Sequence, residues 1–362
     1  MIAEPPAAGR PAGQAPRESQ LDGLRLLAFL AVFAHHADEA RCPWGGLGVE
    51  FFFALSGFLI TRILVGSESG RIGVDLRRYY IRRTLRIFPL YYLTIALAWY
   101  ANPRIKDLGY LLTFTLNIKR ALEPGLDRTL GHFWTLCVEE QFYLLYPLVL
   151  LATPRRARFP CLGVMIAGSV AFQAYAATRW NLRAVRILLP FCGEHLLWGC
   201  VAGLIDLRHP RPRRCEGATC FLAGWPLLAL GWGLHERRLP LPGPAQDVAS
   251  VTITGVACAL IVFGASRCTA RWIVAPLAAG PVAALGRISY GLYALHMPML
   301  NLWYYEIYYC YLFPRVWASL ALTVGLAALS WRYFEGPINR LKDRFAPPEP
   351  APGAAPAGAV MA

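Results

Sequence analysis

The sequence predicts an all-α polytopic membrane protein with about ten transmembrane helices. Of its 362 residues, 56% are apolar and only 16% are charged, and the mean hydropathy is +0.39. A soluble domain has roughly 45–50% apolar and about 25% charged residues. The chain also contains a series of apolar runs, and a membrane-spanning helix needs about 20 such residues. Ten helices would use about 200 residues, a little over half of the chain.

The two ends of the chain are expected to lie outside the membrane domain. Residues 1–20 are rich in Pro, Ala and Gly and lack an apolar core, which predicts a disordered cytoplasmic arm and not a signal peptide. Residues 341–362 predict a similar disordered tail, rich in Pro and Ala. The membrane domain is therefore expected to cover residues 21–340.

Between these ends the apolar runs follow one another with short polar loops. An eleventh run, over residues 108–118, is too short to cross a bilayer as a helix. The ten long runs lie near 24–40, 47–66, 80–101, 132–153, 161–178, 186–205, 219–235, 248–266, 282–304 and 315–335.

Positively charged loops orient the predicted helices. The segment 62–86 holds seven arginines and is therefore expected in the cytoplasm. If residues 108–118 do not cross the membrane, the arginine-containing loops at 155–158 and 208–214 are cytoplasmic as well. If they do cross, both loops move outside. We therefore expect ten spans, both termini in the cytoplasm, and a re-entrant or interfacial segment at 108–118.

The net charge of +14 comes from 36 basic and 22 acidic residues. Because the cations lie mainly in short loops between apolar runs, they indicate contact with anionic lipid and not with nucleic acid. The cysteines show no CxxC spacing, which argues against a zinc site and a disulfide framework. His132 and His195 also lack a ligand-like spacing to any partner, so no metal is expected.

Several ionisable residues fall inside the apolar runs. A charged side chain at the bilayer centre costs about 2.5–3.5 kcal/mol on insertion scales, so each one is a candidate functional residue. These residues are Arg25, His36, Glu50, Arg86, Glu139, Glu140, Glu194, His296 and Glu335.

Their depths in the membrane suggest one site. His36 lies eleven residues after Arg25, about 16 Å along a helix, while His296 lies roughly 20 Å into its own span. Glu139 is about 10 Å below the outer surface of the membrane. An imidazole beside a carboxylate is typical of a general base and its orienting partner. Glu139 and Glu140 face about 100° apart, so only one can share the site, and we expect Glu139. A histidine of this kind, taken alone, is more often an interhelical hydrogen-bonding residue than a catalyst.

Six motifs occur in order along the chain. They are LDGLRLLAFLAVFAHH at 21–36, GVEFFFALSGFLI at 48–60, RRTLRIFPLYY at 82–92, FWTLCVEEQFYLLYPL at 133–148, GRISYGLYALHMP at 286–298 and SWRYFEGPINR at 330–340. Together they resemble the acyltransferase 3 family of integral-membrane acyltransferases, and the resemblance covers almost the whole of the predicted membrane domain.

The fourth motif departs from the family at two positions. Thr135 and Cys137 stand where the family usually has serine. Thr135 keeps a hydroxyl group four residues before Glu139, whereas Cys137 does not keep one. Cys137 therefore raises a covalent cysteine nucleophile as an alternative mechanism.

The resemblance implies transfer of a short acyl group, usually acetyl, from cytoplasmic acyl-CoA to a carbohydrate-type hydroxyl. Acceptors in the family include surface polysaccharides, peptidoglycan, Nod factors and macrolides. The expected partners are acyl-CoA as co-substrate, this acceptor and membrane lipid, with no cofactor. Some members carry an additional extracytoplasmic hydrolase-like domain, and this sequence is expected to be a stand-alone acyltransferase.

An acyl-CoA thioester is already activated, so the acceptor hydroxyl mainly needs deprotonation and positioning. We expect His36 to be the general base and Glu139 to orient it. Arg25 and Arg86 are expected to hold CoA phosphates or polarise the acyl carbonyl. Gly57 is expected to contribute to a tunnel wall. The side chains expected to contact substrate are completed by Ser56, Thr135, Tyr290 and His296.

The main alternative is a transporter or flippase of a glycoconjugate that performs no chemistry. Buried Arg, His and Glu residues also occur in proton-coupled carriers. No internal repeat is apparent, although such repeats are common in transporters. A non-catalytic CoA sensor is a second alternative. Release of free CoA from acetyl-CoA distinguishes an enzyme from both.

Overall fold

The computed structural model describes residues 18–103, 105, 107–123, 129–180, 182–209, 215–236, 243–302 and 312–345. Every regular element among these residues is helical, which confirms the all-α class. Most of the expected arm and tail lies outside the described residues. At their inner edges, however, Ser19 and Gln20 belong to the first helix, and residues 341–345 belong to the last one.

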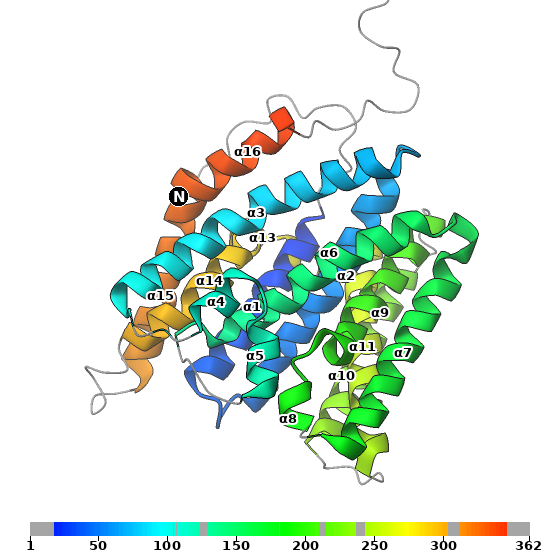
Figure 1. Ribbon diagram of the computed structural model, residues 1–362, viewed down its shortest axis with the longest axis horizontal. Helices are drawn as coiled ribbons and strands as arrows, with labels where there is room; N and C mark the ends of the chain where they lie inside the picture. Colours follow the sequence, from blue (N-terminus) through cyan, green and yellow to red (C-terminus); the bar gives the residue numbers. More distant parts are fainter. Residues whose placement is uncertain are drawn as a thin grey trace, which may run out of the picture.

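Nine helices of 19 residues or more form the body of the described structure (Figure 1). They are α1 (Ser19–Ala37), α2 (Leu47–Gly66), α3 (Ile72–Ala101), α6 (Trp134–Ala152), α7 (Arg158–Arg179), α9 (Leu189–Arg208), α10 (Glu216–His235), α11 (Gly243–Arg267) and α15 (Leu312–Ser330).

Shorter elements connect these helices. They are η1 (Pro43–Gly46), α4 (Leu108–Leu112), α5 (Leu116–Leu122), η2 (Gly131–Phe133), η3 (Arg155–Ala157), α8 (Leu182–Val185), α12 (Arg271–Ala278), α13 (Gly280–Arg287), α14 (Ser289–Leu302), the π-helical turn η4 (Trp331–Glu335) and α16 (Gly336–Phe345).

Five of the described segments are both long and apolar enough to cross a membrane, which is fewer than the ten expected. They are Pro43–Gly66, Gly131–Ala152, Arg155–Arg179, Glu216–His235 and Ala245–Arg267.

Two expected segments illustrate how the tertiary structure divides apolar runs. The run expected at 282–304 is split into α13 and α14 at Ile288, and α14 has only 14 residues. Fourteen residues extend about 21 Å, whereas the hydrocarbon core is about 30 Å thick. The short run at 108–118 forms α4 and the start of α5, of five and seven residues, and neither can span the membrane.

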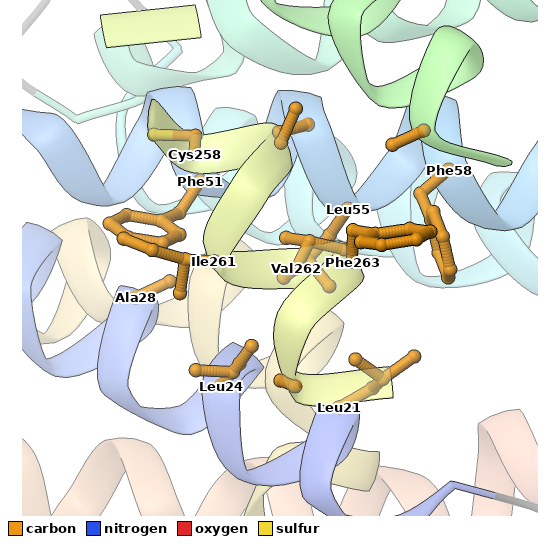
Figure 2. Packing of buried hydrophobic residues seen from close by; sticks show 14 of the residues in the cluster. Leu21, Leu24, Ala28, Phe51, Leu55, Phe58, Cys258, Ile261, Val262 and Phe263 are labelled. Atoms are coloured by element: carbon orange, nitrogen blue, oxygen red, sulfur yellow. The ribbon is translucent and has the colours of Figure 1, made fainter. Parts of the chain in front are cut away.

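The largest buried cluster lies where α11 packs between α1 and α2 (Figure 2). Ile261 and Val262 of α11 are fully buried there. They face Leu24 of α1 and Leu55 of α2 in the same cluster. This packing fixes α1, which carries the predicted base, against the centre of the molecule.

Helices α2 and α9 approach each other at glycine residues. A Cβ atom on Gly57 would collide with the backbone carbonyl of Leu196, and one on Gly199 would collide with that of Ala54. Gly57 is therefore packed against the backbone of α9. Its neighbour Ser56 is turned toward α6, where its hydroxyl contacts Glu139.

The elements that carry the predicted site meet on one side of this core. Helix α3 packs against α14, α6 and α16, and Figure 1 shows it running across the array beside α16. Helix α14 also packs against α1. As a result, side chains from α1, α2, α3, α6 and α14 face a common region.

Candidate active site

His36 lies in the last turn of α1 and is joined to α14 by a hydrogen bond between two imidazole rings. Its Nδ1 lies 3.0 Å from Nε2 of His296. The Nδ1 of His296 lies 2.6 Å from the backbone carbonyl oxygen of Tyr293. His296 is fully buried and contacts the rings of Phe29 and Phe33, whereas His36 is half-buried. Access to this pair is therefore from the His36 side.

The hydrogen-bond directions in this chain assign the protons of both rings. A carbonyl oxygen can only accept, so Nδ1 of His296 carries its proton and, in a neutral ring, Nε2 accepts. His36 must then donate from Nδ1 to His296. The remaining nitrogen of His36, Nε2, keeps its lone pair. A neutral His36 in this tautomer has the form that a general base requires.

His132 of η2 forms the third member of a histidine cluster. Its ring centroid lies 4.7 Å from that of His296 and 6.4 Å from that of His36. The side chain is buried, and neither ring nitrogen makes a hydrogen bond of ordinary geometry with the described residues. The cluster therefore holds a buried imidazole that packs beside the backbone of Ala294 and Tyr293.

Thr135 and Tyr293 hold the beginning of α6 against α14. The Thr135 hydroxyl and the Tyr293 hydroxyl lie 2.6 Å apart, and each also contacts the backbone carbonyl of His132, at 3.0 Å and 3.2 Å. Both side chains are buried. The hydroxyl of Thr135, a predicted substrate residue, thus contacts the backbone carbonyl of His132. Among the described residues, no hydrogen bond joins Thr135 to Glu139.

Glu139 is bound to α2 and not to the histidine cluster. The Ser56 hydroxyl donates to Glu139 at 2.9 Å, and the Tyr143 hydroxyl donates to Ser56 at 2.8 Å. Within the part of the chain that the structure describes, no hydrogen bond joins Glu139 to His36. The predicted orienting position beside His36 is occupied by His296.

Two arginines bring positive charge to Glu139. The charges of Arg83 and Arg25 both act on this carboxylate. The guanidinium of Arg83 lies over the Tyr143 ring at 3.6 Å and also acts on Glu140. Arg25 forms an ion pair with buried Asp22, with 2.6 Å between nitrogen and oxygen. The result is a buried polar band that contains both signs of charge.

Arg86 lies at the other end of this band, near η4. Its guanidinium is 5.8 Å from the Trp331 ring centroid, and its charge acts on Glu335 and Tyr290. The Tyr290 hydroxyl donates to the backbone carbonyl of Ile87 in α3 at 2.8 Å. Tyr290 therefore ties α14 to α3 beside Arg86. A π-helical turn such as η4 is frequent at functional sites.

Cys137 has an apolar environment. It is fully buried in the cluster that contains Tyr91 and Phe133. The Tyr91 hydroxyl lies 4.0 Å from its sulfur and donates to the carbonyl of Leu111. Among the described residues no histidine contacts the Cys137 sulfur, so these contacts supply no base that could activate it.

In the part of the chain that the structure describes, the three histidines are not grouped as metal ligands. The facing nitrogens of His36 and His296 are used in their mutual hydrogen bond. Across the described ranges, no group of three or more His, Cys, Asp or Glu residues is arranged to hold a metal ion.

The sequence did not predict two residues of this site, His132 and Arg83. His132 appeared only as an isolated histidine without ligand spacing, and Arg83 only as one member of a basic run. A signal for Arg83 was its position three residues before Arg86, which places both on one helix face. His132 directly precedes the fourth motif, but only the fold brings it to His296.

Comparison with known proteins gives one family. The family model described as an acyltransferase domain, Acyl_transf_3, matches residues 18–333. No solved structure gives a significant match.

Curated relatives agree with this family. The peptidoglycan O-acetyltransferase OatA of Listeria monocytogenes is 26% identical over 348 residues, covering 88% of this chain and 55% of the relative. The putative peptidoglycan O-acetyltransferase YrhL of Bacillus subtilis is 28% identical over 355 residues, covering 88% and 54%. The O-acetyltransferase OatA of Staphylococcus aureus is 24% identical over 399 residues, covering 88% and 57%. The chain spans about half the length of these relatives.

Proposed function

This chain belongs to the acyltransferase 3 family, and we propose that it transfers a short acyl group from acyl-CoA to a hydroxyl group of a carbohydrate acceptor, with His36 as the general base. The observation that carries the proposal is the hydrogen-bond chain from His36 through His296 to the Tyr293 carbonyl. These two hydrogen bonds leave Nε2 of His36 as a proton acceptor in a site that is otherwise buried.

The reaction then needs no covalent acyl-enzyme. Nε2 of His36 removes the proton of the acceptor hydroxyl while its oxygen attacks the thioester carbonyl carbon. The carbon–sulfur bond breaks, and the proton passes from the imidazolium to the leaving CoA thiolate. Because His36 keeps donating from Nδ1 to His296, the ring retains its orientation in both protonation states.

The arginines are proposed to bind the phosphates of acyl-CoA, and Glu139 is proposed to balance their charge. Arg25, Arg83 and Arg86 carry positive charge into the same region, and guanidinium groups bind phosphates bidentately. The carboxylate of Glu139 balances the charges of Arg25 and Arg83, while Arg25 itself is paired with Asp22. Ser56 and Tyr143 hold Glu139 in place.

The relatives support the proposed acceptor class, because one is named a peptidoglycan O-acetyltransferase and another a putative peptidoglycan O-acetyltransferase. A sugar hydroxyl of a cell-envelope polymer or glycolipid is accordingly the proposed acceptor, and a glycosylated metabolite such as a macrolide is a further candidate. Thr135 and His296 are the proposed acceptor contacts near His36, and Tyr290 is the proposed contact beside Arg86.

The proposed topology has ten crossings and both termini in the cytoplasm. Support comes from the five segments that meet the length and hydropathy of a span, and from the arginine-rich segments at 62–86 and 155–158. A cysteine introduced as Glu39→Cys is expected to react with an impermeant thiol reagent from outside the cell. The Arg156→Cys variant is expected to react only after permeabilisation. The reverse pattern would contradict the orientation.

The activity is tested by thiol release from acetyl-CoA with purified protein in lipid and peptidoglycan fragments, glycolipids or a macrolide as acceptor. His36→Ala is expected to lower the rate by about 10²–10⁴-fold, the usual contribution of a general base. His35→Ala is the matched control, because His35 bonds to the Cys42 carbonyl and lies outside the hydrogen-bonded pair. Equal activity of His36→Ala and wild type would refute the proposed base.

A covalent cysteine mechanism gives a different result in the same assay. Direct transfer predicts that Cys137→Ser keeps most of the activity, while an acyl-cysteine intermediate predicts its loss. Acceptor-dependent transport without release of free CoA would instead support the transporter alternative.

A further inference from the structure

A basic cavity lies away from the proposed active site, where the ends of α2 and α9 meet η3 and the beginning of α7. It has a volume of about 290 Å³ and is lined by four arginines, Arg155, Arg156, Arg158 and Arg208, together with apolar side chains that include Val65 and Phe159. We propose that this cavity, which we call the arginine pocket, binds the phosphate headgroup of an anionic phospholipid.

The charge of the arginine pocket favours an anion. Glu68 is the only carboxylate among the described residues that hydrogen-bonds to these arginines, through Arg158 and Arg155. No described carboxylate pairs with Arg156 or Arg208, and both are exposed. The pocket therefore keeps a net positive charge, to which the N-terminus of the 22-residue helix α7 adds its dipole.

Two of the arginines are held in place by the protein. Arg158 is 4% exposed and reaches Glu68 at 2.7 Å. The guanidinium of Arg208 lies 4.4 Å from the centroid of the Phe159 ring. Such preorganised groups lose less conformational entropy when they bind a phosphate.

The position of the arginine pocket identifies the source of the phosphate as lipid. The pocket is lined by Val65, at the end of the spanning segment Pro43–Gly66, and by the first residues of the spanning segment Arg155–Arg179, so it lies at the membrane surface. Only 22% of the apolar window of the second segment is buried within the protein. Val164, two turns below the pocket, is 73% exposed. A lipid bound by its headgroup could thus lay its acyl chains along α7.

Binding of fluorescent phosphatidylglycerol to the purified full chain in neutral detergent tests this proposal. Wild type is expected to bind saturably and more tightly than it binds phosphatidylcholine. The double variant Arg156→Gln/Arg208→Gln is expected to bind about 25-fold more weakly, from about fivefold for each arginine near a membrane surface. Arg156→Lys is expected to retain binding because it keeps the charge.

The matched control removes two exposed arginines elsewhere, as Arg179→Gln/Arg340→Gln, and is expected to bind like wild type. An equal loss in the control would overturn the pocket as the site. Equal affinity for phosphatidylcholine would show a non-specific apolar crevice. Displacement of the lipid by glycerol 3-phosphate as effectively as by unlabelled phosphatidylglycerol would show a site for soluble phosphate esters, and it would overturn the lipid assignment.

Discussion

His36 obtains its chemical state from a residue 260 positions away in the chain. The sequence could indicate His36 and His296 as intramembrane histidines and Glu139 as a carboxylate at similar depth. The sequence could not decide whether His296 or Glu139 would contact His36, because the depth of a residue along a helix does not fix the rotation of that helix. The packing of α14 against α1 made this choice in favour of His296.

Substitution of His296 tests its positioning role. His296→Ala removes the acceptor of the His36 Nδ1 proton and is expected to lower kcat by about 10²-fold, as misorientation of a catalytic group typically does. His296→Gln is expected to recover part of the rate, because its side-chain oxygen can accept the same hydrogen bond. The KM for acyl-CoA should stay unchanged in both variants. Steady-state thiol release measures both constants, and a kcat equal to wild type in His296→Ala would contradict this role.

Glu68, outside the spanning segments, provides a pH-dependent contribution to stability. The hydrogen bond from Arg158 lowers the pKa of this carboxyl below its ordinary value of 4.5. A lowered pKa in the folded state stabilises the protein above the unfolded-state pKa, and this stability is lost as the pH falls through the folded-state value. Glu68→Gln is therefore expected to lower Tm by a few degrees at pH 7 and to match wild type near pH 3.

Thermal unfolding in detergent between pH 7 and pH 3 measures this difference. The exposed residue Glu39 supplies the control, since Glu39→Gln should leave Tm unchanged across the range. A Tm difference for Glu68→Gln that stays constant down to pH 3 would argue against the ion pair.

At the scale of elements, the contact between α2 and α9 determines where the Ser56 hydroxyl lies. The two helices approach so closely at Gly57 and Gly199 that a methyl group on either would meet backbone atoms. This contact turns the adjacent Ser56 toward Glu139 on α6. Of these two neighbouring residues, Gly57 packs α2 against α9 and Ser56 contacts the candidate site.

Gly57→Ala is expected to destabilise the protein by about 1–3 kcal/mol, the usual cost of overpacking. Gly163→Ala in α7 is the matched control, because a Cβ atom there meets nothing within 4 Å. That control is expected to be neutral or to gain about 0.5–1 kcal/mol from the higher helix propensity of alanine. Unfolding midpoints of both variants check the difference, and equal stabilities would mean that the α2–α9 contact is loose.

At the scale of the whole molecule, a chain of alternating charges joins five elements at one end of the helix array. Glu18 pairs with Arg62 of α2, and Arg62 pairs with Asp206 of α9. Asp206 also pairs with buried Arg267 of α11, which contacts Glu216 of α10. These pairs therefore connect the beginning of α1 to α2, α9, α10 and α11 through charged side chains.

Removal of the central acid tests this connection. Asp206→Asn removes a negative charge beside Arg267, whose side chain is 4% exposed. It is expected to lower the free energy of unfolding by about 3 kcal/mol, because Arg267 keeps a buried charge with fewer partners. Asp38→Asn is the control, because Asp38 pairs with Arg41, which is 76% exposed, and such a pair contributes less than about 1 kcal/mol. Chemical unfolding in detergent compares the two. A similar small effect in both would show that the charge chain does not hold the helices together.

The sequence by itself determined the helical class, the membrane environment and the family, because each depends on composition, run length and ordered motifs. It also indicated His36, Glu139, Arg86 and Tyr290 as candidate site residues, since polar groups are costly inside a bilayer. Local sequence carries these signals directly.

The tertiary structure alone decided which of these residues meet. It paired His36 with His296, placed Glu139 on Ser56, brought in His132 and Arg83, and divided the apolar run at 282–304 into two short helices. The physical reason is that pairing depends on the rotation and crossing of whole helices. These are set by backbone contacts such as Gly57 against Leu196 and by buried charge pairs between distant helices, and neither is encoded in the spacing of residues along one helix.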